Sequence, residues 1–389
     1  MFAMVRRHTG VKFAILAYAA TALMLCVTPT SRSITEALPQ RLDDRTYWTL
    51  ITEFSEPNGF FRSDNLVSNE MVFQHVIPTL QKSVTPASAY VGVGPDQNFT
   101  YIAQLKPRIA FIVDIRRQNM IEHLMYKAVI ELSTDRADFL SRLFSRPRPE
   151  EARSNTDVVE LFDFFQGVEP DPHLFADNFA AIKEQLIKTH GFELSTDDVN
   201  TLEYVYRAFY TSGPNLGYSA VRPGTVRILP TYEELMTDTD EVGQRRSYLA
   251  TEENFATVRR LEANNLIVPL VGDFAGPTTI RSIGRYLKDH SSTVAAFYTS
   301  NVEQYLFMSD DGWKNFYSNV SMLPISTNSV FIRPLINTGT GAYTSSPQFR
   351  AGFHWDTVLF PIGDLTGAFQ ANLIRTYYDV IEVTRPLLR

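Results

Sequence analysis

The spacing of apolar and polar positions changes at residue 89 from a helical period to short continuous apolar runs. Two such runs, residues 89–93 and 109–113, are separated by a polar segment in which Phe99, Ile102 and Ala103 have helical spacing. Short apolar runs without alternation are typical of strands that are buried on both faces of a parallel sheet. The pattern therefore predicts a strand, a helix and a second strand, which together form a βαβ unit.

The same rhythm returns near the C-terminus and extends the predicted sheet. We expect helices over residues 252–264, 278–288, 302–307 and 313–320, and strands over 266–271, 293–298, 329–332 and 352–360. Strands that alternate with helices predict an α/β fold with a doubly wound, mostly parallel sheet.

Between and before these regions the pattern is helical, which divides the chain into segments. Residues 34–85 predict N-terminal helices, and residues 118–144 predict one long helix. Residues 150–245 leave the βαβ rhythm and predict a helical insertion over the mouth of the sheet. Residues 86–149 and 246–389 would then be the two halves of the sheet domain.

Polar residues follow several of the apolar runs, and these residues are the candidates for a site. In an open α/β sheet, ligands bind outside the carboxyl ends of the strands. We expect the following residues to contact a cofactor: Gly92, Gly94, Asp96, Gln97, Asn98, Asp114 and Asp273. Asn301 and Arg116 are the candidates for a substrate contact. The alternative is that these residues serve ordinary turns, caps and a solvated helix start.

The spacing of the glycines bears on the kind of ligand. Gly92 and Gly94 would let the backbone approach a bound molecule, and Asp114 is placed to accept hydrogen bonds from a ribose hydroxyl. A dinucleotide fingerprint needs a third glycine three residues after the second, where this chain has Gln97. NAD is therefore disfavoured.

Two segments carry a resemblance to a known family. They are residues 90–102, Tyr-Val-Gly-Val-Gly-Pro-Asp-Gln-Asn-Phe-Thr-Tyr-Ile, and residues 111–119, Phe-Ile-Val-Asp-Ile-Arg-Arg-Gln-Asn. The chain resembles an uncharacterised bacterial family with a Rossmann domain like that of class I S-adenosylmethionine methyltransferases. The family itself brings no established activity and no catalytic residue. The likeness of its glycine turn and strand-end acid to those of class I methyltransferases implies S-adenosylmethionine as the cofactor and methyl transfer to an unknown acceptor.

Two positions depart from the methyltransferase pattern. Tyr90 stands where an acid is usual, and Asp96 stands where the last glycine is usual. These departures favour the alternative of a non-catalytic, envelope-associated protein that binds another small molecule or a partner in the same crevice.

The N-terminus predicts export or a membrane anchor. Arg6, Arg7 and Lys12 precede an uncharged, mostly apolar run over residues 13–27, and small polar residues follow it. This arrangement within residues 1–33 is typical of a signal peptide or an anchor, with membrane association through residues 13–27. The body would then lie in the periplasm or cell envelope. If the start codon is mis-assigned, the protein would be cytoplasmic.

Composition excludes several classes of function. The formal net charge of −7 argues against binding nucleic acid through a broad basic surface. The one cysteine, Cys26, lies in the apolar N-terminal run, so the body has no disulfide or thiol nucleophile. No cluster of histidines and acids has metal-binding spacing, and we expect no metal.

Overall fold

The computed structural model describes residues 37–84, 88–218, 229–336 and 355–384. The predicted leader, residues 1–33 with Cys26 and the apolar run 13–27, lies outside these residues. Among the helices that the structure describes, none has the length and apolar character needed to cross a membrane.

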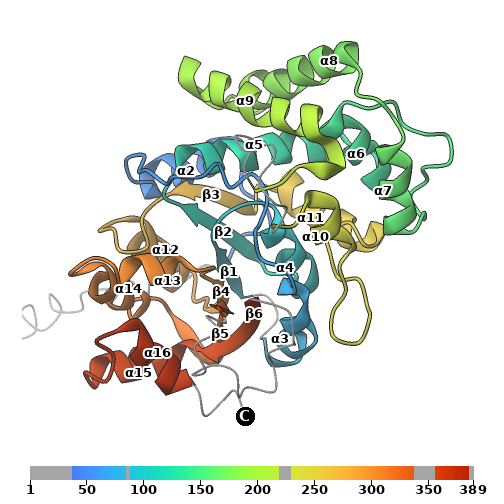
Figure 1. The fold of residues 1–389 in the computed structure, drawn as a ribbon. Coiled ribbons are helices and arrows are strands. Elements are labelled where there is room, and N and C mark those ends of the chain that lie inside the picture. The colour runs from blue at the N-terminus through green and yellow to red at the C-terminus, as the bar shows by residue number, and fades with distance from the viewer. Residues whose placement is uncertain (1–36, 85–87, 219–228, 337–354, 385–389) are drawn as a thin grey trace, which may run out of the picture. The chain divides into compact units, whose positions relative to one another are not determined.

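The described residues form one six-stranded sheet, in the order β3-β2-β1-β4-β5-β6 (Figure 1). The strands are β1 (Ala89–Gly92), β2 (Ile109–Asp114), β3 (Ile267–Val271), β4 (Val294–Tyr298), β5 (Ile325–Ile336) and β6 (Trp355–Pro361). The first five run parallel, and β6 pairs with β5 in the antiparallel direction. The predicted α/β class with a mostly parallel sheet is confirmed, and the sheet is consistent with a Rossmann-like fold.

Burial on both faces explains why continuous apolar runs became strands. Every residue of β1, β2, β3 and β4 is buried. In register, Val91 of β1 pairs with Phe111 of β2 on one side and with Phe297 of β4 on the other. The chain leaves β1 toward β2 and β3 and later returns to place β4 beside β1. The order of the strands therefore reverses between β1 and β4, which is the topological switch point of the sheet.

Helices pack in two groups on the sheet. The first group is α4 (Gln97–Leu105), α5 (Arg117–Leu132) and α11 (Glu252–Ala263), in which α11 contacts both α4 and α5. In the second group, α12 (Thr279–Asp289) contacts α2 (Asp44–Phe54) and α14 (Gly312–Val320). Figure 1 shows the groups on the two sides of the sheet. The remaining elements near the sheet are η1 (Phe73–Val76), α3 (Ile77–Ser83), α13 (Val302–Leu306), α15 (Ile362–Gln370) and α16 (Tyr377–Thr384).

The single long helix expected over residues 118–144 is two helices, α5 and α6 (Arg136–Phe144). Ser133 has extended backbone angles, and its hydroxyl donates to the carbonyl of Val129 at 2.6 Å. Asp135 then accepts the amide of Asp138 at 2.8 Å and caps α6. The sequence Ser-Thr-Asp therefore ends one helix and begins the next, because these side chains compete for backbone hydrogen bonds.

The described part of residues 150–245 is mainly helical. They contain α7 (Val158–Gln166), α8 (Pro172–Lys183), the π-helix η2 (Glu184–Thr189), α9 (Thr196–Ser212), η3 (Gly213–Asn215) and α10 (Tyr232–Thr237). The helix α9 packs on α5. Near its start, Asp198 accepts two hydrogen bonds from Arg117, at 2.6 and 2.9 Å. This pair brings the start of α9 close to the carboxyl end of β2.

Candidate functional site

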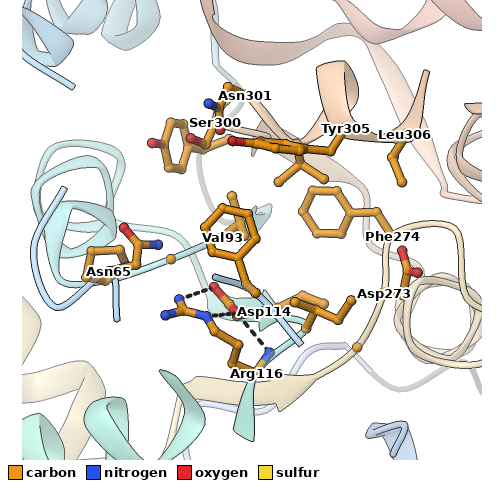
Figure 2. Close-up of a pocket in the computed structure, with 18 of the residues that line it drawn as sticks. Asn65, Val93, Asp114, Arg116, Asp273, Phe274, Ser300, Asn301, Tyr305 and Leu306 are labelled. Atoms are coloured by element: carbon orange, nitrogen blue, oxygen red, sulfur yellow. Dashed lines mark hydrogen bonds and ion pairs between the residues drawn. The ribbon is translucent and has the colours of Figure 1, made fainter. Parts of the chain in front are cut away.

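A cavity of about 370 Å³ lies at the carboxyl ends of the first four strands, at the switch point between β1 and β4. The residues that line it come from six places in the chain: 60–69, 93–95, 113–116, Tyr218, 272–274 and 298–309. Figure 2 shows Asp114 and Arg116 on one wall, Ser300 and Asn301 on the opposite wall, and Phe274 and Asp273 at one side. Its volume falls in the range of pockets that bind small organic molecules.

The structure brings some of the predicted site residues to this cavity and leaves others behind its wall. Gly94, Asp114, Arg116, Asp273 and Asn301 line the cavity. Gly92, Asp96, Gln97 and Asn98 are absent from the lining; the last three, at most 1% exposed, are buried beneath the glycine turn.

The glycine turn after β1 is held in shape by Asn98. Its amide group donates to the carbonyls of Val93, Gly94 and Pro95, at 2.9, 3.2 and 2.7 Å. Its Oδ1 accepts the hydroxyl of Tyr90 at 2.8 Å. A Cβ on Gly92 would collide with Asn98 Oδ1, and Gly94 has a φ of +79° that side chains rarely adopt. Tyr90, which replaces the expected acid, therefore acts as a buried support of the turn.

The carboxylate of Asp114 is already paired within the chain. Arg116 donates to its Oδ1 from Nε at 3.0 Å and to its Oδ2 from Nη2 at 2.9 Å. Both side chains are buried, and Arg116 also donates from Nη1 to the carbonyls of Ser63 and Asp64. Arg116 thus neutralises Asp114 and holds the segment around residue 63 against the end of β2.

Asp273 belongs to a loop that is fixed by Glu56. The carboxylate of Glu56 accepts the amides of Asp273, Thr278 and Thr279, at 3.1, 2.6 and 3.0 Å. The N-terminus of α12 is therefore occupied by a side chain of the protein itself, which satisfies its free amides. Asp273 Oδ1 accepts the amide of Ala275 at 2.8 Å, and the partly exposed side chain faces the cavity.

Aromatic side chains that the sequence did not suggest form much of the cavity wall. Phe61 meets Tyr305 edge to face, with ring centroids 5.4 Å apart, and Phe274 lies at the side of the cavity (Figure 2). Phe60 is 85% exposed at the rim, which is unusual for a phenylalanine. Such walls suit a flat, partly apolar ligand.

Buried acids lie behind the cavity. Burial raises the pKa of Glu70 to about 7, and Glu70 accepts a hydrogen bond from Ser300 of the cavity wall. Burial also raises the pKa of Asp96 to about 7, where Tyr248 donates to it at 3.2 Å. The neighbouring His123 contacts the carbonyl of Gly94 at 2.8 Å, and burial lowers its pKa to about 4. In sequence, Ser300 could have been found by the strand-end rule, because it follows β4.

A second cavity of about 690 Å³ adjoins the first. Phe60, Phe61 and Arg116 line both cavities. The other walls of the second cavity are mostly polar and come from residues 58–59, 117–118 and 195–204. The start of α9 thus builds a second hollow beside the strand ends. Among the described residues, no group of three His, Cys, Asp or Glu side chains could hold a metal ion.

Fold and cavity together define an α/β protein with a Rossmann-like sheet and a hollow of ligand size at its switch point. Residues 65–160 and 153–360 match the family model described as "Domain of unknown function (DUF7790)", and the chain belongs to this family. No match to a curated protein was found.

Proposed function

We propose that the cavity at the switch point binds S-adenosylmethionine and that the protein transfers its methyl group to an acceptor of unknown identity. The observation that carries the proposal is the place of the cavity, between the glycine turn after β1 and the Asp273 loop after β3. In doubly wound sheets this crevice is the usual ligand site.

The chemistry of the walls supports an adenosine-type ligand. A purine ring would lie between apolar side chains such as Val93, Phe274 and Leu306 (Figure 2). The carboxylate of Asp273 is at the edge of that slot, where it would accept a hydrogen bond from the exocyclic amino group of adenine. A ribose hydroxyl would have to share Asp114 with Arg116 or replace one of its hydrogen bonds.

The second cavity supports a reaction with two ligands. Direct displacement of a methyl group mainly requires that the acceptor atom and the methyl carbon are aligned. An acceptor in the second cavity would approach the first cavity past Phe60 and Phe61, which line both.

The alternative proposal is a non-catalytic protein of the cell envelope that binds another small molecule or a partner in the same crevice. The pairing of Asp114 with Arg116 favours it, because a carboxylate with both oxygens bonded offers less to a ribose.

Calorimetric titration of the full-length protein with S-adenosylmethionine separates the two proposals. The first expects saturable binding that Asp273→Ala weakens by about tenfold or more, as expected for a lost charge-assisted hydrogen bond. Asp197→Ala is the matched control, because this exposed acid lines the second cavity and not the first. No binding at millimolar ligand would overturn the first proposal.

A further inference from the structure

A buried carboxyl group lies behind the wall of the cavity and is hydrogen-bonded to a hydroxyl group of that wall. Glu70 is 1% exposed, and its Oε1 accepts a hydrogen bond from the hydroxyl of Ser300. Ser300 itself lines the cavity opposite Asp114 (Figure 2). The charge of Glu70 therefore changes the electrostatic potential at Ser300, and a charged ligand beside Ser300 changes the potential at Glu70.

The backbone holds Ser300 in an uncommon conformation. Its φ is +48°, which is in the left-handed region that residues other than glycine seldom adopt. The conformation follows directly after β4, where Thr299 donates its amide to the carbonyl of Ile332 at 3.1 Å. Such conformations cost free energy and are concentrated at functional sites.

In the described part of the chain, the surroundings of Glu70 contain polar groups and no compensating cation. The groups that face its carboxyl are Tyr90 of β1, Gln97 and Tyr101 of α4, and Tyr298 at the end of β4, together with Ser300. Among the described residues, the groups that shift the pKa of Glu70 include no lysine or arginine. A buried carboxylate without a cation is costly, which is why burial holds its pKa near 7.

We propose that Glu70, acting through Ser300, makes the cavity selective for ligands that place a cationic centre, such as a sulfonium or ammonium group, beside Ser300. The cation supplies a positive charge that the described residues around Glu70 do not. It stabilises the carboxylate form of Glu70, so the carboxyl proton is released to water as the ligand binds. Because the hydroxyl of Ser300 donates its hydrogen to Glu70, the lone pairs of its oxygen are available to the cation.

The fixed charges of the cavity agree with this assignment. Arg116 would repel a cation, but its charge is balanced by Asp114 across two hydrogen bonds. Asp273 adds a negative charge to the wall. Within the described lining, the balance of charge therefore favours a cation once Glu70 is ionised.

The test rests on the proposed binding of S-adenosylmethionine and uses a neutral ligand of the same skeleton. S-Adenosylmethionine carries a sulfonium, whereas S-adenosylhomocysteine carries a neutral thioether. Both are titrated calorimetrically into the full-length protein at about pH 5.5 and about pH 8, on either side of the Glu70 pKa. We expect the affinity ratio of sulfonium to thioether to rise about tenfold with pH in the wild type, and to stay constant in Glu70→Gln. Asp177→Asn, at an exposed acid that lines neither of the two cavities, should behave as the wild type.

A second measurement needs no variant and covers the case in which Glu70→Gln does not fold. Titration of the wild type near pH 7 in two buffers of different ionisation enthalpy gives the number of protons released. The sulfonium ligand should release a fraction of a proton, and the thioether should release none. If both ligands bind with an affinity ratio that does not change with pH, and release the same number of protons near pH 7, the role of Glu70 is overturned while the binding site stands. If neither ligand binds, the proposed function is overturned as well.

Discussion

Arg116 donates two side-chain hydrogen bonds to the carboxylate of Asp114, at 3.0 and 2.9 Å, from a position two residues later in the chain. The backbone of Arg116 is extended, with φ −97° and ψ 131°. In an extended chain, residues two apart point to the same side, which places the guanidinium against the carboxylate. The acid that ends β2 is therefore both a wall of the cavity and one half of a buried ion pair.

Removal of Arg116 should destabilise the fold. Arg116→Ala leaves the buried Asp114 without its partner and frees the segment at Ser63 and Asp64. We expect a loss of about 3 kcal/mol in the free energy of unfolding, measured by urea denaturation. Lys188→Ala, which removes an exposed i,i+4 pair with Glu184, should change it by less than about 0.5 kcal/mol. Equal losses in the two variants would contradict the structural role of Arg116.

Gly94 of the glycine turn and Gly191, far from it in the chain, offer a matched pair of substitutions. Gly94 and Gly191 both have positive φ, +79° and +69°, and a Cβ at either would meet no close contact. Gly94→Ala and Gly191→Ala should each cost about 1 kcal/mol of stability. Since Gly94 lines the cavity, its substitution alone should weaken binding of S-adenosylmethionine several-fold by calorimetry. Binding that is unchanged in Gly94→Ala would place the ligand away from the turn.

Asp96 should make stability depend on pH. Burial raises its pKa in the folded protein to about 7, above the ordinary 3.8 that applies when it is unfolded. The folded state then holds a proton that the unfolded state has lost, so the stabilisation is complete below the unfolded pKa. Stability falls as pH rises from about 4 through about 7.

Asp96→Asn should remove this dependence, because it imitates the neutral acid. We expect the variant to match the wild type near pH 4 and to exceed it near pH 8 by up to about 4 kcal/mol, in paired urea titrations. The same pH slope in variant and wild type would show that Asp96 is ionised in the folded protein at neutral pH.

Part of the site could be predicted because strand ends obey a simple geometric rule. Gly94, Asp114, Asp273 and Asn301 each follow an apolar run, and parallel strands bring their carboxyl ends to one edge. The same rule covers Ser300, one residue before Asn301. The placement of the polar residues after Gly94 was harder to predict, because a helix begins at Gln97 and buries Gln97 and Asn98 beneath the turn.

The rest of the cavity depends on tertiary contacts that no local pattern encodes. Phe60, Phe61 and Glu70 lie in a segment without regular structure between α2 and η1. Its path is set by long-range hydrogen bonds, from the Gly59 amide to the Ile115 carbonyl and from the Leu66 amide to the Tyr218 carbonyl, at 2.8 and 3.1 Å. Periodicity does not report such contacts.

Hydrogen exchange with and without saturating S-adenosylmethionine tests most directly whether the switch-point cavity is the ligand site. The proposed site predicts slower amide exchange in residues 93–98, 272–276 and 298–306 of the full-length protein, because ligand binding to the native state suppresses local opening around it. The ligand is used at the concentration where calorimetry shows saturation, or at millimolar concentration if calorimetry shows no binding. Unchanged exchange in all three segments would then contradict the proposed site.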